Sequence, residues 1–279
     1  MTVYALIPVF NRLELTRRVL ECLRAQRADE RMKVIVIDDG STDGTGEFLA
    51  QQGDITVLKG DGTLWWGGAI SLGLHHVLRE GGPEDWVLLV NNDTQFCHEF
   101  VQGLLDTARA HRPAAVGSVI CDEANPEFVI SIGAALDTWR LRTRDRLEQQ
   151  RRRDCAKGPH VVDALSARGT LYPLQALRSA GLMNPVWLPH YLADYELAVR
   201  VRKAGYRLLV SEQSVVLSAN TFGSAWRPPG LVKKFFAIRS PHYLPAVLAF
   251  WWRASSFMER LSLLPRLIYV SLPFRRSVQ

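Results

Sequence analysis

The sequence of 279 residues has little cysteine and no long apolar run. Its four cysteines, Cys22, Cys97, Cys121 and Cys155, are widely spaced and form no CxxC pair. This spacing excludes a disulfide scaffold and the usual zinc and thioredoxin patterns. The most apolar late stretches, 244–252 and 261–274, are shorter than the roughly 18 to 20 residues that a membrane-spanning helix needs. The first residues lack a basic leader, so we expect a first strand rather than a signal peptide, and a cytoplasmic protein.

Two motifs of nucleotide-binding proteins are missing as well. No G-x-G-x-x-G follows the first apolar run, which disfavours a dinucleotide-dependent dehydrogenase, and the phosphate loop G-x-x-x-x-G-K-[ST] is absent. Negative charge is in the minority, because 34 Lys and Arg outnumber 28 Asp and Glu. The excess of positive charge suits a partner that carries pyrophosphate or an anionic surface. Nucleic acid is not expected, since no groove-reading motif accompanies the charge.

Apolar runs alternate with helical patterns over the first 120 residues. This alternation predicts an α/β fold, with βα units around a mostly parallel central sheet that is flanked by helices. We expect strands at 4–7, 34–37, 55–58, 86–90, 116–120, 161–165, 206–210 and 215–217. Helices are expected after the early strands, at 174–180 and at 191–204, the last closed by Gly205. One domain over 1–226 and a basic helical tail over 227–279 are predicted.

Three acidic elements stand where a strand or turn meets a helix. They are Asp38 with Asp39, Asp93 in the sequence NNDT at 91–94, and Asp194 with Glu196. NNDT directly follows a predicted strand, and open α/β sheets bind their ligands at the carboxyl ends of strands. Because an unpaired carboxylate near a buried sheet edge is costly, we expect partners such as a metal ion, a base N–H or a hydroxyl.

Several stretches resemble family 2 glycosyltransferases with the GT-A fold. ALIPVFNR at 5–12 and VIVIDDGSTDGT at 34–45 resemble the opening of that family. NNDT resembles its D-x-D-type element, and ADYELAVR at 193–200 resembles the acidic catalytic motif of its inverting members. GDGTLWWGGA at 60–69 is similar to the bacterial rhamnosyltransferase-like branch. The resemblance extends over 3–225 and implies a nucleotide-binding half at 1–120 and an acceptor-binding half at 121–226.

The resemblance also implies an activity and its residues. A sugar would pass from a nucleotide-diphosphate donor, dTDP-rhamnose or a UDP-hexose, to a hydroxyl of a glycan or lipid-linked glycan in bacterial surface polysaccharide synthesis. Asp194 would be the catalytic base, and Asp93 would coordinate Mg²⁺ or Mn²⁺ on the donor pyrophosphate. Asp39 would accept a hydrogen bond from a pyrimidine base. The donor-binding residues would be Pro8, Asn11, Asp39, Trp65, Asn92 and Asp93, and the acceptor-binding residues Thr170 and Glu196.

Structural roles compete with several of these assignments. Asp194 could instead be the N-cap of a helix over 195–204, and Glu196 could pair with Arg200 one turn later. Asp38 could line the pocket or form an Asx turn. Asp43 is expected to cap the helix that follows it.

Two departures from the family pattern leave a non-catalytic nucleotide-sugar or glycan-binding relative as the alternative. Asn91 takes the first position of the D-x-D-type triplet, and Ser218-Ala219-Asn220 stands where many relatives place a metal-binding histidine.

Two basic segments lie outside these motifs. Residues 137–157 hold eight Arg or Lys against four Asp or Glu, which is typical of a solvated hairpin or loop. After residue 230 eight further Arg or Lys alternate with aromatic residues, and Glu259 is the only acid. A cationic, aromatic-rich tail favours helices that lie at an anionic membrane surface, here the inner face of the cell membrane. The alternatives are packing on the main domain and a homodimer through the tail.

Overall fold

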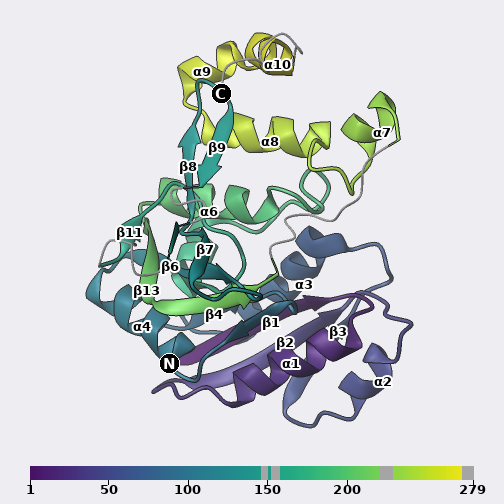
Figure 1. Ribbon diagram of the computed structural model, residues 1–279, viewed down its shortest axis with the longest axis vertical. Helices are drawn as coiled ribbons and strands as arrows, with labels where there is room; N and C mark the ends of the chain where they lie inside the picture. The colour runs from purple at the N-terminus through teal and green to yellow at the C-terminus, as the bar shows by residue number, and fades with distance from the viewer. Residues whose placement is uncertain (146–149, 152–157, 220–228, 272–279) are drawn as a thin grey trace.

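The computed structural model describes residues 1–145, 150–151, 158–219 and 229–271, and it is an α/β protein around one large sheet (Figure 1). The main path of the sheet has the strand order β10-β7-β6-β12-β4-β1-β2-β3. Its first half consists of the parallel strands β1 (Thr2–Val9), β2 (Arg31–Asp38), β3 (Ile55–Lys59) and β4 (Trp86–Leu89). The predicted fold class, a mostly parallel sheet with flanking helices and a helical C-terminal region, is confirmed.

Both faces of this half are covered by helices, as strands of near-continuous apolar sequence require. Successive side chains of β1 point to opposite faces. Val3 and Ile7 pack in one core cluster with residues of α1 (Leu13–Arg24) and α4 (Phe100–Ala110). Tyr4 and Leu6 pack in the other cluster with residues of α3 (Trp65–Glu80). The short helix α2 (Thr45–Ala50) follows β2.

The second half of the sheet is mixed. β12 (Thr170–Pro173) runs antiparallel between β4 and β6 (Ala114–Asp122). β13 (Arg207–Ser218) is parallel to β6, with a register shift between Ser211 and Val215. The two strands predicted at the ends of β13 are thus one strand with a bulge. Shorter strands complete the sheet: β5 (Thr94–Phe96), β7 (Phe128–Ser131), β10 (Gln150–Arg151) and β11 (His160–Val161).

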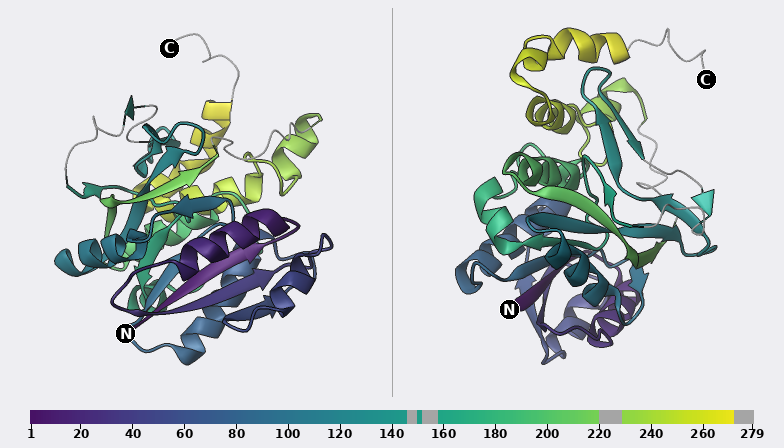
Figure 2. Two further views of the ribbon diagram at one scale, coloured as in Figure 1. Left: turned by 60° about the horizontal axis from the view of Figure 1, so that its bottom comes forward. Right: turned by 90° about the vertical axis from the view of Figure 1, so that its left-hand side faces the viewer.

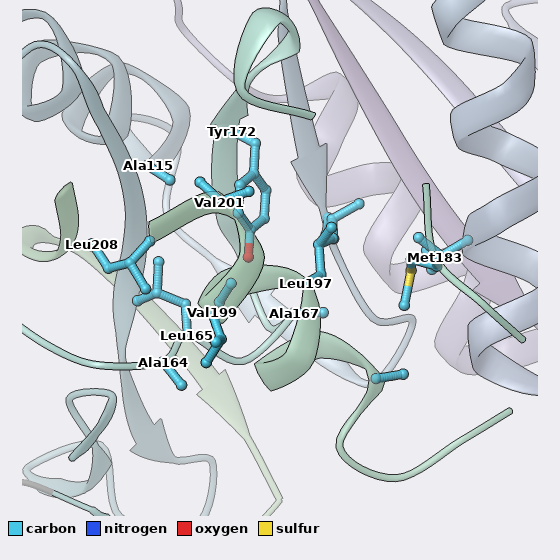
Figure 3. Close-up of a cluster of buried hydrophobic side chains, with 14 of the residues drawn as sticks. Ala115, Ala164, Leu165, Ala167, Tyr172, Met183, Leu197, Val199, Val201 and Leu208 are labelled. Atoms are coloured by element: carbon cyan, nitrogen blue, oxygen red, sulfur yellow. The ribbon is translucent and has the colours of Figure 1, made fainter. Parts of the chain in front are cut away.

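Helices α5 (Leu174–Ala180) and α6 (Ala193–Lys203) pack on the face that α3 also covers. Figure 3 shows the contact: Tyr172 of β12 lies among Leu197 and Val201 of α6 and Leu165 of the preceding loop. Tyr172 is 1% exposed, so this packing determines where the N-terminus of α6 lies on the sheet.

The basic segments form a separate layer above the sheet. The antiparallel hairpin of β8 (Ala134–Asp137) and β9 (Arg142–Asp145) rises toward the C-terminal helices (Figure 2). Those helices are α7 (Leu231–Phe236), α8 (Leu244–Ala254), α9 (Phe257–Leu261) and α10 (Leu263–Ser271). Arg266 joins the two parts, because its Nη1 donates to the carbonyl of Thr138 at 2.6 Å and its guanidinium lies over the Trp139 ring. The predicted hairpin is confirmed for the described part of 137–157; residues 146–149 and 152–157 lie outside it.

Across the part of the chain that the structure describes, every helix is too short or too polar to cross a membrane.

Candidate active site

The loops after β1 and β2 are tied together by Asn11. Asn11 has a φ of 50°, a left-handed conformation that asparagine tolerates better than most residues. Its Oδ1 accepts from the N–H of Thr42 at 2.6 Å, and its own N–H donates to Ser41 Oγ at 3.0 Å. Pro8 stands just before this loop, in register with Ile37 of β2. The predicted nucleotide-binding residues Pro8 and Asn11 therefore lie beside the loop that follows β2.

Asp43 joins the N-termini of two helices. Its Oδ2 accepts from the N–H of Leu13, the first residue of α1, and its Oδ1 accepts from the N–H of Thr45, the first residue of α2, both at 3.1 Å. The hydrogen bond from the Thr45 hydroxyl lowers the pKa of Asp43 most, and the backbone N–H groups lower it further. Asp43 thus bonds the first N–H of α2, although the N-cap position itself belongs to Gly44. The N-cap position of α1 belongs to Arg12, the residue after Asn11.

Asp38 and Asp39, both buried, have different partners. Asp38 Oδ1 accepts from the N–H of Ser41, three residues on, at 3.0 Å, so its carboxylate stabilises the local turn, although with a longer span than the Asx turn that was one of its two alternatives. Asp39 instead holds the 60–65 loop: its Oδ1 accepts from the N–H of Gly62 at 2.9 Å and its Oδ2 from the N–H of Trp65 at 3.1 Å. A Cβ on Gly60 would lie 2.4 Å from Asp39 Oδ1, which explains the glycine at that position.

Trp65 and Trp66 open α3 and point to different partners. The Trp66 indole N–H donates to Asn91 Oδ1 at 3.0 Å and joins the helix to the loop after β4. The ring of Trp65 lies 5.9 Å from that of His190. Gly67 allows this arrangement. Its N–H donates to the carbonyl of Pro189 at 2.7 Å, and a Cβ on Gly67 would lie only 2.2 Å from the carbonyl oxygen of Leu188. The start of α3 is therefore docked on the loop that leads to α6.

Asp93 is half-buried and only partly paired. Its Oδ2 lies 3.2 Å from Nη1 of Arg12, while its Oδ1 is shielded from solvent and has no hydrogen-bond partner among the described residues. A shielded carboxylate oxygen without a partner is unfavourable unless a ligand binds it. Asn92 does not share this orientation: it is 6% exposed, and its Nδ2 lies 3.4 Å from Thr16 Oγ1 of α1. The prediction that Asn92 binds the donor is therefore not supported by its side-chain position.

Asp194 is the second residue of α6, and the N-cap position belongs to Leu192, so the N-cap alternative is wrong. Its Oδ2 accepts from the N–H of Ala167 at 3.2 Å, and its Oδ1 accepts from the N–H of Tyr195 at 2.9 Å. Burial raises the pKa of Asp194, and the two N–H groups oppose this rise only in part. A carboxylate whose proton affinity is increased, but which two backbone groups still hold in place, has the properties of a general base.

The two predicted acceptor-binding residues are almost fully buried. Glu196 is 1% exposed and pairs with Arg200 Nε at 2.8 Å and with Arg253 Nη1 at 3.0 Å. Thr170 is also 1% exposed, and its hydroxyl donates to the carbonyl of Ser166. Both side chains are buried and bind partners within the fold, as buried polar groups must, and their role in acceptor binding stays a prediction.

His190 and Arg239 belong to this region although no sequence motif singled them out. The Nδ1 of His190 is shielded and has no hydrogen-bond partner among the described residues. Burial lowers the pKa of His190, and the positive charges of Arg12 and Arg239 lower it further. Arg239 comes from the C-terminal tail, with its guanidinium carbon 5.7 Å from the centre of the Trp65 ring.

Contacts connect two of the acidic elements, Asp39 and Asp93, to His190. Asp39 bonds the backbone of Trp65, whose ring contacts His190, four positions before Asp194. Asp93 pairs with Arg12, whose charge acts on the same His190 ring. The loops after β1, β2 and β4 are thus linked through Arg12, Asp93, Asp39 and Trp65 to His190, which precedes α6 in the chain.

Asp93 could hold a divalent ion together with ligands from outside the protein. No group of three or more His, Cys, Asp and Glu side chains that could hold a metal occurs among the described residues. Mg²⁺ needs less than that, because it is commonly held by one or two carboxylates together with substrate phosphates and water. The unpaired Oδ1 of Asp93 meets this requirement. At the position of the family histidine, Ser218 is 1% exposed, and Asn220 lies outside the described residues.

Several solved structures share the fold of this chain. The structure of GalNAc-T7 with UDP, GalNAc and Mn²⁺ matches 89% of this chain at a TM-score of 0.67 and 15% identity, and the chain spans 47% of its length. TarS 1-349 from S. aureus matches 97% of this chain at a TM-score of 0.59 and 14% identity, over 79% of its own length. The mannosyltransferase PcManGT from Pyrobaculum calidifontis, with GDP-Man and Mn²⁺, matches 97% at a TM-score of 0.56 and 17% identity, over 76% of its own length.

No curated protein matches the sequence. At these identities the structural matches establish the GT-A fold alone. The family is established by the sequence itself, because the model of glycosyl transferase family 2 matches residues 4–167, more than half of the chain. The protein belongs to glycosyl transferase family 2.

Proposed function

We propose that the protein is an inverting glycosyltransferase in which Asp194 is the general base. The observation that supports the proposal is the Asp194 carboxylate at the start of α6, which two backbone N–H groups hold in place and whose pKa is raised by burial. Asp194 takes the proton of an acceptor hydroxyl while the hydroxyl oxygen attacks the anomeric carbon of the donor sugar. The bond from that carbon to the diphosphate breaks on the opposite face, which inverts the configuration.

The donor in this proposal is a nucleoside-diphosphate sugar, dTDP-rhamnose or a UDP-hexose. Pro8, Asn11 and Asp39 would border the nucleoside. Asp39 already accepts two backbone N–H groups, but each carboxylate oxygen has a further lone pair for a base N–H. Trp65 would offer a flat surface to the sugar or base. Asp93 would hold Mg²⁺ or Mn²⁺ through its unpaired Oδ1, and the ion supplies charge that neutralises the diphosphate.

An Asp194→Asn variant tests the base. It keeps the size of the side chain but cannot accept the proton, so we expect transfer to fall by about a hundredfold or more. Asp106→Asn, an exposed helix position, is the matched control and should transfer at the rate of the unmodified protein. Transfer is measured with dTDP-rhamnose and UDP-hexoses and a panel of glycan acceptors. Full activity of the Asp194→Asn variant would remove the role of Asp194.

One observation favours a second candidate, a nucleotide-sugar-binding protein without catalysis. Asn91 replaces an acid of the D-x-D-type element, and its Oδ1 is engaged by Trp66. Such a protein would bind the donor, show neither transfer nor donor hydrolysis, and bind equally well after the Asp194→Asn substitution.

We also propose that residues 227–279 form a unit that contacts an anionic membrane, where a lipid-linked glycan acceptor would lie. The boundary with the catalytic unit 1–226 falls outside the described residues. Support comes from what we call the tail surface, the large apolar side chains of α7–α10 that are 53–74% exposed. They are Val232, Phe236, Trp252, Phe257, Met258, Leu261, Leu264, Ile268 and Tyr269. Arg260 lies over the Trp252 ring, so cations accompany the apolar groups.

Vesicle sedimentation tests the tail surface. Phe257 and Leu261 lie one turn apart on α9, and replacing both with Ser should abolish binding to vesicles that contain phosphatidylglycerol. Val161→Ser, at an exposed apolar position of β11, is the control. Binding that the double variant retains would contradict the proposal, and so would a concentration-dependent dimer that the double variant abolishes without any vesicle binding by the original protein.

A further inference from the structure

Arg239 connects the C-terminal tail to the candidate donor site. Its guanidinium carbon lies 5.7 Å from the centre of the Trp65 ring, and the backbone N–H of Trp65 is bonded to Asp39. Guanidinium groups at this distance from an indole face are attracted to it. Arg239 is therefore a specific point at which the tail reaches the 60–65 loop and the site that this loop borders.

The backbone around Arg239 is held in a defined turn. The side chain of Ser240 is fully buried; its hydroxyl donates to the carbonyl of Lys234 and accepts from the N–H of His242 at 3.1 Å. The N–H of Ser240 also donates to the carbonyl of Ala237 at 2.9 Å. Because α7 and the segment before α8 are tied together in this way, the position of Arg239 is set by the fold rather than by a free chain.

The charge of Arg239 is not neutralised. Among the described residues no carboxylate lies within ion-pair distance of it, whereas Arg12, whose charge also acts on His190, is paired with Asp93 at 3.2 Å. Burial lowers the pKa of the His190 imidazole, and the charges of both guanidinium groups lower it further. Two cations from opposite ends of the chain therefore face one region that offers a single unpaired carboxylate oxygen. Such a region attracts an anion.

We propose that Arg239 is a donor-binding residue whose guanidinium pairs with the diphosphate of the nucleotide sugar and with the departing nucleoside diphosphate. This inference rests on the proposed function. A guanidinium suits the role, because its planar set of donors matches two phosphate oxygens at once. As the glycosidic bond breaks, negative charge grows on the diphosphate oxygen, and a cation already in place stabilises that charge without reorganisation. The Trp65 ring orients the side chain before the donor arrives.

The test compares ligands that differ only in the diphosphate. Binding of UDP, dTDP, uridine and thymidine to the full chain is measured by calorimetry, with and without Mn²⁺. We expect Arg239→Gln to weaken binding of UDP or dTDP about tenfold and to leave the weak binding of the nucleoside unchanged. Arg239→Lys, which keeps the charge but loses the paired donors, should fall between the two. In transfer assays Arg239→Gln should lower kcat as well as raise KM, since the contact strengthens as the diphosphate leaves.

Arg260→Gln is the matched control. Arg260 belongs to the same tail and lies at a similar distance, 5.4 Å, over the ring of Trp252, which is a residue of the tail itself. Its replacement should leave binding of every nucleotide unchanged. Thermal melting of each variant shows whether it is folded, and Arg239→Lys decides the question if Arg239→Gln does not fold.

The outcomes separate this inference from the proposed function. An original protein that binds none of the nucleoside diphosphates would overturn the proposed function itself. Equal binding of UDP by the original protein and by Arg239→Gln would overturn the role of Arg239 alone. Equal losses for UDP and uridine would show that Arg239 acts only through the packing of Trp65, which also overturns the inference.

Discussion

Glu196 of α6 lies 3.0 Å from Arg253 of α8, and this ion pair attaches the C-terminal helices to the helix that carries Asp194. Glu196 is 1% exposed and also accepts from Arg200, so its carboxylate bridges two cations inside the protein. Movement of α8 is thereby coupled to the helix that starts beside the candidate base.

Glu196→Gln should destabilise the protein by about 3 kcal/mol, the lower range for removing one member of a buried ion pair, because Arg253 is partly exposed. Urea unfolding measures the change. Glu99→Gln is the control, since its pair with Arg27 spans 4.0 Å in solvent and should contribute less than about 1 kcal/mol. Equal effects of the two substitutions would show that the bridge does not stabilise the fold.

The pH dependence of transfer should report Asp194. Burial raises its pKa above the ordinary value, so the protein loses its base at a higher pH than a free aspartate would. As the pH is lowered, kcat/KM, which reports the free enzyme, should therefore begin to fall before the pH reaches about 4, the ordinary value for aspartate. A pH profile of kcat/KM measures the position of this limb. An acid limb at or below that pH would argue that another group is titrating.

The same raised pKa affects the pH dependence of stability. Most carboxylates in folded proteins stabilise the fold when ionised, whereas ionised Asp194 destabilises it. The folded protein takes up the proton of Asp194 at a higher pH than the unfolded chain does. Ionised Asp194 therefore costs folding free energy at neutral pH, and its contribution improves as the pH falls through the folded pKa. We expect the difference in unfolding free energy between the original protein and Asp194→Asn, measured with urea, to become smaller as the pH is lowered. A difference that does not change with pH would contradict this.

Gly67→Ala should disrupt the site at its structural base. The added methyl would meet the carbonyl oxygen of Leu188 at 2.2 Å, so α3 or the loop before α6 must shift, at a cost of roughly 1–3 kcal/mol or more. Transfer should fall with the melting temperature. Gly53→Ala, where nothing lies within 4 Å, is the control and should leave both unchanged. A Gly67→Ala protein with normal activity would mean that the loop is not positioned by α3.

Asp93→Asn should abolish binding of the metal ion, and with it the enhancement of donor binding by that ion. The substitution takes away the charge that the unpaired Oδ1 offers to Mg²⁺ or Mn²⁺. Calorimetry of UDP or dTDP with and without Mn²⁺ should show enhancement by the ion in the original protein and none in the variant. Asp61→Asn, whose carboxylate forms a local turn with Thr63, is the control. Enhancement that survives in Asp93→Asn would place the ion elsewhere.

The local parts of this protein follow from its sequence. Buried strands such as β1 and β2 have apolar residues on both faces, and Gly205, with a φ of 95°, ends α6 where a glycine was expected to end a helix. The turn chemistry of Asp38 and the partnership of Glu196 with Arg200 are likewise short-range, so sequence spacing alone predicted them as alternatives.

Long-range contacts decided the rest. The packing of α8 against α6 decided the environment of Glu196. Arg253 of α8 pairs with its carboxylate, and no sequence motif connects α8 with α6. Sequence spacing also has no means of bringing Arg239 to Trp65, because their contact depends on a turn fixed by buried Ser240. The sequence by itself determined the family, the βα order and the acidic elements, since these are written in local patterns. Only the tertiary structure decided which of the polar side chains are enclosed within the fold and which remain unpaired for a ligand, because burial is a property of the whole packed chain.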